Sequence, residues 1–380
     1  MASWVTEETS NFSLQNLPYG VFSTKGSKPR IGVAIGDYVL DLTVLAEEGV
    51  FDDLDFDITT LKQSTLNEYA ALAKSVHSGL RHRLQKLLEK DTRSGKVLRD
   101  NQGLRDKALV PLDSVKMHLP MIIGDYTDFF VGLHHAVTFP VDGKVVSGPC
   151  RKFDHEVEFA CFIGRGNAMG TPIDVDAAED YIFGFVLMND WSARDIQMYE
   201  ATLMGPFNGK SFCTTVSPWV VPPEALEPFR VAPKATPREL PDYLVEKNQR
   251  SVYDIPIRAT LGANGQRYRI ADCNTNNVIF SFAQMIAHHT RGGCPLRTGD
   301  LVATGTLSGP KRENAGCLLE QTLGGTDPCE MAAENSTEDN VRRAYLEDND
   351  TVEFTAQVTG PDGIGNVGFG VCSGKVLPAI

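Results

Sequence analysis

The sequence predicts a mainly β protein, an α+β fold with few helices, built as two domains. Two hydrophobic runs joined by a Gly-Asp pair, over residues 31–42, predict a β-hairpin near the N-terminus. From Met121 onward strand patterns dominate, and the clearest is the alternating run at residues 351–358. With 380 residues, 42% of them hydrophobic, the chain can bury two cores. We therefore expect an N-terminal domain over residues 1–117 and a C-terminal domain over residues 118–380.

Helical spacing is confined to a few segments. The longest expected helix begins at Thr65, where Glu68 completes a capping-box pattern, and its hydrophobic residues recur at helical spacing as far as Leu88. Ser192 can cap a short helix that follows it directly. A further helix is expected over residues 282–290, because a Gly-Gly pair follows shortly after.

The composition excludes several functional classes. A net charge of −13 and an isoelectric point near 5.1 disfavour nucleic acid as a partner. The eight cysteines form no Cys-x-x-Cys pair, which suits reduced thiols in a cytosol. The N-terminus lacks the pattern of a signal peptide, and no hydrophobic run reaches transmembrane length. We therefore expect a cytoplasmic protein without a membrane partner.

Two acidic residues lie two positions apart inside a hydrophobic, β-prone run. On a strand, Glu156 and Glu158 share one face. Buried there, the two like charges repel unless a cation, a proton or cationic side chains neutralise them, and a divalent metal is the simplest neutraliser. The alternative is a solvated sheet face, with Val157 and Phe159 directed into the core. The pattern alone leaves both interpretations open.

Two more acids follow other predicted strands. Asp190 closes the hydrophobic run at residues 183–189, and Asp128 follows the run at residues 121–123. Four oxygen donors from three segments suit a hard cation such as Mg²⁺, Ca²⁺ or Mn²⁺. Zinc fits less well, because no Cys or His with the spacing of zinc ligands lies nearby.

The chain resembles the fumarylacetoacetase family over nearly its whole length. The resemblance rests on six segments in the family's order, and the run Asn-Asp-Trp-Ser-Ala-Arg-Asp at residues 189–195 is almost verbatim. It implies an SH3-like N-terminal barrel and a C-terminal β-roll that forms a homodimer and holds the active site. The implied activity is hydrolysis of a carbon–carbon bond in a β-diketone, a step of tyrosine and phenylalanine catabolism. The six segments are residues 124–129, 155–158, 188–195, 209–212, 303–306 and 374–378.

The resemblance also implies a role for individual residues. The general base matches His135, and the carboxylate that orients it matches Glu320. The stabilisers of the oxyanion and carbanion match Arg194, Gln197 and Lys210. The substrate contacts match Thr306, Phe130 and again Gln197. At the position of Phe130 the family has a tyrosine. The positions around the divalent metal match Asp128, Glu156, Glu158, Asp190 and Lys210. The position near a second, monovalent cation matches Thr214.

These residue types suit the implied chemistry. Cleavage of a 1,3-diketone requires a water made nucleophilic by a base and a leaving carbanion stabilised as an enolate. A histidine titrates near neutral pH, and a carboxylate partner fixes its tautomer. Sequence alone does not distinguish His134 from His135 as the base, and the family match favours His135.

The chain also departs from the family pattern. Between His135 and Cys150 only residues 136–149 remain of a longer segment that carries a substrate-binding arginine and a tyrosine, and Ala201 replaces another tyrosine. The chemistry is therefore expected to be kept and the recognition changed. Decarboxylation, isomerisation or hydrolysis of a different keto acid is the alternative function, and an internal deletion in a fumarylacetoacetase would give the same pattern. A non-catalytic protein would be expected to lack the full acid set.

Overall fold

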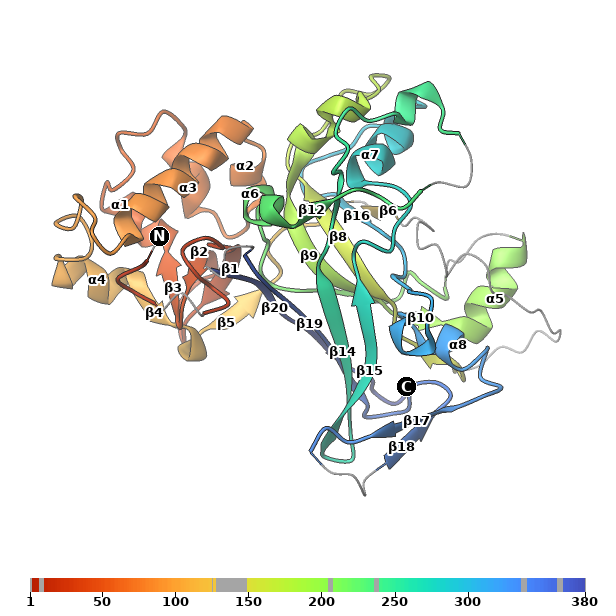
Figure 1. Ribbon diagram of the computed structural model, residues 1–380. Coiled ribbons are helices and arrows are strands. Elements are labelled where there is room, and N and C mark those ends of the chain that lie inside the picture. Colours follow the sequence, from red (N-terminus) through yellow and green to blue (C-terminus); the bar gives the residue numbers. More distant parts are fainter. Residues whose placement is uncertain are drawn as a thin grey trace.

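The computed structural model confirms the mainly β, α+β class. It describes residues 2–6, 10–124, 126–127, 149–203, 208–235, 239–335, 340–360 and 365–379. Figure 1 shows the N-terminal part on the left and the C-terminal part on the right, linked by the long strands β19 (Thr351–Thr359) and β20 (Asn366–Lys375). The strand predicted at residues 351–358 is therefore confirmed.

The N-terminal part is a curled, five-stranded antiparallel sheet with the order β4-β3-β2-β1-β5. The predicted hairpin is confirmed, since Ile35 pairs with Tyr38 across a turn at which Gly36 has a φ of 58°. The residues just before the expected domain boundary supply the two edge strands of this sheet, β4 and β5. The strands are β1 Tyr19–Ser23, β2 Arg30–Ile35, β3 Tyr38–Asp41, β4 Leu109–Pro111 and β5 Lys116–His118.

The long N-terminal helix is interrupted, which corrects the prediction. Helix α2 (Asn67–Ala70) ends before α3 (Lys74–Leu88) begins, and α2 has no side-chain cap, so the capping box expected at Thr65 is absent. The carbonyl of Tyr69 accepts from the backbone N–H of Leu72 at 3.2 Å and lies 2.9 Å from Nε2 of His77 on α3, so a turn bond and a side-chain contact replace the regular helical bond here. The other helices of this part are α1 Leu42–Glu47, η1 Ile58–Lys62, α4 Gln102–Ala108 and η2 Leu112–Ser114.

Two sheets form the C-terminal part. The first has the order β11-β9-β8-β16-β6 and the second the order β15-β14-β19-β20. Every residue of β8 (Val157–Ile163) and β9 (Ile182–Asp190) is buried, which explains their continuous hydrophobic runs. The remaining strands of the two sheets are β6 Tyr126–Thr127, β11 Thr214–Val216, β14 Pro256–Ala263, β15 Gln266–Asn274 and β16 Leu301–Ala303.

Short elements surround these sheets. The helix predicted at residues 282–290 is confirmed as α7 (Phe282–Thr290), and Ser281 and Gln284 form its capping box. The helix after Ser192 is α5 (Arg194–Leu203), but Ser192 Oγ donates to the carbonyl of Asp190 at 2.9 Å, so the predicted cap is wrong. The remaining elements are β7 Phe153–Asp154, β10 Ser192–Ala193, β12 Arg230–Val231, β13 Val252–Tyr253, β17 Cys329–Ala332, β18 Asn340–Arg343, η4 Val175–Tyr181, α6 Pro223–Leu226, η5 Glu227–Phe229, η6 Asp242–Leu244, η7 Arg312–Asn314 and α8 Leu318–Gln321.

Strand β8 packs into a different core on each of its faces. Phe159 and Cys161 belong to the C-terminal core, whereas Ala160 and Phe162 belong to a core shared with the N-terminal sheet and helices. Side chains alternate along a strand, so Ala160 and Phe162 lie on the same face as Glu158. The N-terminal part therefore covers the face of β8 that begins with the acids. The division at residues 117 and 118 stays a prediction.

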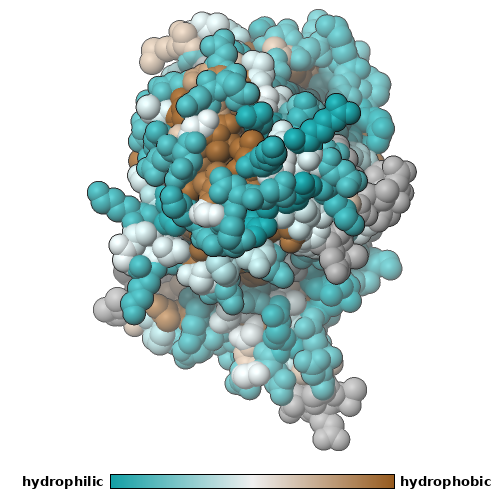
Figure 2. All heavy atoms as spheres, turned by 90° about the vertical axis from the view of Figure 1, so that its left-hand side faces the viewer, coloured by the Kyte–Doolittle hydropathy of each residue, from teal (hydrophilic) through white to brown (hydrophobic). Residues whose placement is uncertain are grey.

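The face formed by the N-terminal part is mainly hydrophilic, with one larger hydrophobic area (Figure 2). All eight cysteines are free thiols. Among the described residues, no helix is long and hydrophobic enough to cross a membrane.

Candidate active site

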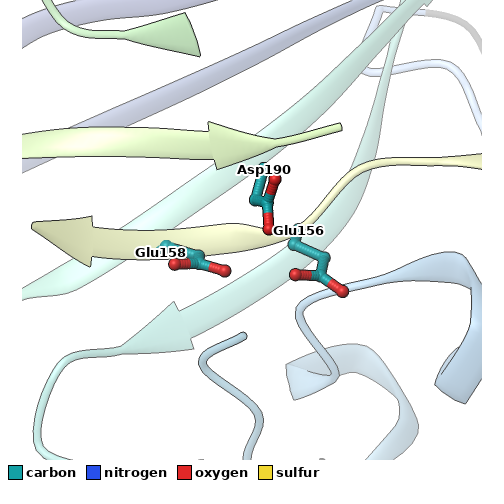
Figure 3. A group of neighbouring side chains, drawn as sticks. All are labelled: Glu156, Glu158 and Asp190. Carbon is teal, nitrogen blue, oxygen red and sulfur yellow. The ribbon is translucent and has the colours of Figure 1, made fainter. Parts of the chain in front are cut away.

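Three carboxylates meet where β8 and β9 lie beside each other. One oxygen from each of Glu156, Glu158 and Asp190 lies within 4.8 Å of the others, and all three residues are buried (Figure 3). The antiparallel pairing of Val157 with Asn189 brings the start of β8 to the end of β9. The alternative of a solvated sheet face is therefore wrong, and the paired acids form a buried cluster.

Two cationic side chains share the neutralisation of this cluster. Lys210 Nζ lies 2.5 Å from Oε2 of Glu156 and 2.7 Å from Oδ2 of Asp190. Arg194 Nη1 lies 2.5 Å from Oε1 of Glu156, and its Nε lies 2.9 Å from Oδ2 of Asp154. The sequence favoured a divalent metal as the simplest neutraliser of these acids. The structure shows that two cationic side chains share this role.

The charge balance still leaves room for a divalent cation. The four carboxylates of Asp154, Glu156, Glu158 and Asp190, taken together with Arg194 and Lys210, give these six buried side chains a formal charge of −2. Oδ1 of Asp190 is buried and has no hydrogen-bond partner among the described residues. A buried negative charge of this size is costly without a counter-ion. The oxygen-only donor set fits a hard divalent cation.

The pKa shifts follow from this burial. Burial raises the pKa of Asp190 to about 6, against the opposing effect of Lys210. Burial alone would lower the pKa of Arg194, but the carboxylates of Glu156 and Asp154 hold it well above its usual value. The guanidinium therefore stays charged.

The start of α5 and the segment before β11 complete one wall of the site. Gln197 Oε1 accepts from Nη1 of Arg194 at 3.1 Å. Gly209 lies so close to α5 that a Cβ there would stand 2.7 Å from the backbone of Gln197, and this close approach places Lys210 beside the acids. Thr214 pairs with Asp190 across β11 and β9, so the residue expected near a monovalent cation lies next to a predicted ligand.

The opposite wall comes from the segment after β16 and from α8. The N–H groups of Thr304 and Leu307 donate to the carbonyls of Phe159 and Val157 at 3.0 and 2.8 Å, so buried Thr306 runs alongside Glu158. On α8, Oε1 of Glu320 accepts from Ser308 Oγ at 2.9 Å. The sequence gives no signal for this serine.

Three predicted site residues, Asp128, Phe130 and His135, lie outside the described residues, as do residues 136–148 of the shortened segment. Their roles stay predictions. Thr127, which precedes Asp128, pairs with Val302 of β16 in the same sheet as the acids.

One buried acid of the site was missed by the sequence reasoning. Asp154 precedes Glu156 by two residues, so the same alternation that groups Glu156 with Glu158 could have found it. It lies on β7 instead of on a hydrophobic run, which hid it.

The fold and the site define an enzyme-like centre for a hard divalent cation, built on antiparallel strands. Two family models match the chain: "Fumarylacetoacetase N-terminal" over residues 15–120 and "Fumarylacetoacetate (FAA) hydrolase C-terminal" over residues 113–375. The chain therefore belongs to the fumarylacetoacetate hydrolase family and is an enzyme of the hydrolase class.

Relatives named fumarylacetoacetase extend over the whole chain. The fumarylacetoacetase fahA of Aspergillus fumigatus is 40% identical over 436 aligned positions, which cover 100% of this chain and 99% of the relative. The fumarylacetoacetase of Oryza sativa is 42% identical and covers 98% of this chain and 96% of its own length. The first alignment is longer than the 380 residues of this chain, so the relative carries additional residues.

A solved structure supports the fold alone. The fumarylacetoacetate hydrolase of Exiguobacterium antarcticum superposes with a TM-score of 0.51 at 18% identity, covering 96% of this chain and 100% of that one.

Proposed function

We propose that the chain hydrolyses the carbon–carbon bond of fumarylacetoacetate or of a closely related β-diketone. The observation that carries the proposal is the buried set of Glu156, Glu158 and Asp190 with Arg194 and Lys210 around it. Relatives named fumarylacetoacetase align with the chain from end to end, which supports the same substrate class.

The acids Glu156, Glu158 and Asp190, with Asp128 as the fourth, would hold the divalent cation, for which Mg²⁺, Ca²⁺ and Mn²⁺ are the candidates. When bound, such an ion supplies Lewis-acid stabilisation of an enolate. Thr214 is proposed to lie near a second, monovalent cation.

The chain's own residues would then divide the remaining work. His135 removes a proton from water, and the carboxylate of Glu320 holds the imidazole in the required tautomer. Water adds to one carbonyl, the carbon–carbon bond breaks, and the carbanion takes up a proton. Arg194, Gln197 and Lys210 are the proposed stabilisers of the developing negative charge.

Recognition of the substrate is proposed to differ from that of the longer relatives. Thr306 and Phe130 are the proposed contacts, and Ala201 on α5 is exposed and carries no hydroxyl. A paralogue that decarboxylates or isomerises another keto acid is the second candidate, favoured by this loss of polar groups. A homodimer and a cytoplasmic location remain proposals, which sedimentation and cell fractionation test.

The deciding experiment incubates purified protein and Mg²⁺ with fumarylacetoacetate, an acylpyruvate and oxaloacetate in parallel. Cleavage of a diketone with release of two acids is expected. Turnover of oxaloacetate alone, with release of CO₂, would replace hydrolysis by the second candidate. A His135→Ala variant separates the two further, because water attack needs the base and decarboxylation does not.

A further inference from the structure

Asp154 is a buried acid to which the proposed function gives no role. Its side chain has no exposed surface. Its Oδ1 accepts from the backbone N–H groups of His155 and Leu318, and its Oδ2 accepts from Nε of Arg194 and from the N–H of Leu319. All four distances are 2.9 Å, so both oxygens have their full complement of donors.

These four bonds join three parts of the site at one carboxylate. Arg194 begins α5, and Leu318 begins α8, the helix that carries Glu320. Asp154 itself ends β7, two residues before Glu156. One side chain therefore fixes the arginine and the helix of Glu320 relative to the acid cluster.

The bonds also fix the guanidinium plane of Arg194. Its Nε bonds Asp154 and its Nη1 bonds Glu156, and two bonds to separate carboxylates leave a rigid planar group little freedom. The third nitrogen, Nη2, is buried and has no hydrogen-bond partner among the described residues. An unpaired buried N–H costs about 1–3 kcal/mol, so its retention points to a ligand that accepts from it.

We propose that Asp154 is a positioning residue, which holds Arg194 so that Nη2 donates to an anionic oxygen of the substrate or its enolate. The inference rests on the proposed function, since it deepens the role of Arg194 in that site. Asp154 touches no reacting atom and acts through the arginine.

An Asp154→Asn variant tests the proposal, because it replaces one accepting oxygen by an NH₂ group, which cannot accept the two hydrogen bonds that this oxygen had received. In either amide orientation, the NH₂ group faces two N–H groups that the carboxylate had accepted from. With the NH₂ group toward Arg194, the guanidinium loses its anchor. We expect kcat to fall about 30- to 100-fold with KM changed less than about threefold.

A binding measurement accompanies the kinetics, because it does not depend on the reaction. Oxalate, a planar dianion that resembles an enolate of a keto acid, is titrated into the Mg²⁺-loaded protein by calorimetry. Asp154→Asn should bind oxalate about tenfold more weakly while its affinity for Mg²⁺ is unchanged. Values are expressed per folded site, counted by bound metal.

The matched control is Asp350→Asn. Asp350 is a buried carboxylate of the same part of the chain, and it accepts from Nε and Nη2 of Arg343 and from the N–H of Glu347, each at 2.9 Å. Its loss should lower the melting temperature and leave kcat and oxalate binding per folded site unchanged.

A double-mutant cycle completes the test. If Asp154 acts through Arg194, adding Asp154→Asn to Arg194→Met weakens oxalate binding no further. The proposal is overturned if Asp154→Asn weakens oxalate binding as much in the Arg194→Met protein as it does in the wild type. It is also overturned if folded Asp154→Asn binds oxalate with wild-type affinity. Should Asp154→Asn not fold, Arg194→Lys carries the test, and full oxalate affinity there also overturns it.

The two proposals fail separately. Coupled losses of oxalate binding in a protein that hydrolyses no diketone would leave the role of Asp154 standing and refute the proposed function.

Discussion

Lys210 and Asp190 form a buried ion pair, with Nζ 2.7 Å from Oδ2 and both side chains almost wholly shielded from solvent. Lys210 also bonds Glu156, so one ammonium group joins the acid just before β8 to the acid at the end of β9. The pair therefore belongs both to the stability of the fold and to the site.

Replacing Lys210 by Met should destabilise the metal-free protein by about 3–5 kcal/mol, because it leaves two buried carboxylates without their shared cation. Urea unfolding measures the loss. Saturating Mg²⁺ should restore more stability in the variant than in the wild type, since the ion then meets more uncompensated charge.

The control for this prediction is Lys107→Met. Lys107 pairs with Glu48 at 2.7 Å, but both side chains are exposed. Its loss should change the unfolding free energy far less than the loss of Lys210 does. Equal effects of the two substitutions would show that burial gives the site pair no special weight.

Replacing Glu158 by Gln should act in opposite directions on metal binding and on stability. The affinity for Mg²⁺ should fall about 100-fold, since one ligand charge is lost. The metal-free protein should become more stable, because one of several buried like charges is removed. Calorimetry and unfolding check the two effects, with exposed Glu330→Gln as the control. Unchanged metal affinity would remove Glu158 from the ligand set.

A Gly209→Ala substitution should disturb the wall between α5 and Lys210. The new Cβ would stand 2.7 Å from the backbone of Gln197, so one of the two segments must move. We expect a loss of about 1–3 kcal/mol in stability and at least about a tenfold fall in kcat. Gly79→Ala is the matched control, because nothing lies within 4 Å of that Cβ on α3, and it should stabilise the protein by about 0.5–1 kcal/mol. Equal kcat values in the two variants would contradict the prediction.

The stability should fall in alkaline solution through Tyr19. Burial raises the pKa of Tyr19 to about 12, with its hydroxyl 3.2 Å from that of Tyr69. The unfolded chain ionises first, so the contribution is complete below pH 10 and is lost as the pH rises towards 12. The rise of the Tyr19 pKa from 10 to about 12 corresponds to a contribution of about 3 kcal/mol to the free energy of unfolding. Tyr19→Phe should flatten the fall of unfolding free energy between pH 10 and 12, and a slope identical to that of the wild type would refute the assignment.

Local patterns predicted the elements that local physics determines. The hairpin at Gly36, the helix that ends before the Gly-Gly pair at residues 292 and 293, and the alternating strand after Asp350 all follow from turn chemistry and periodicity. The pairing of Glu156 with Glu158 was predicted for the same reason, because two-residue alternation places both on one face.

Tertiary contacts decided what the sequence could not predict. The long helix breaks at residues 71–73, where Tyr69 bonds groups outside the helical ladder. The carboxylate of Asp154 reaches α8 across 164 positions of sequence, and no periodicity reports such a contact. The family resemblance named Arg194 and Lys210, but their pairing with the acids appears only in three dimensions.

The shared core beneath β8 makes the two halves of the chain interdependent. Ala160 and Phe162 continue the face that begins with Glu158, and they belong to the same buried core as the leucines of the N-terminal helices. A substitution that creates a cavity among those leucines would weaken the packing of β8, the strand that positions Glu158. Inactivating substitutions in this enzyme should therefore be found far from the bound substrate, in a region that performs no chemistry, and neither half should retain activity when expressed alone.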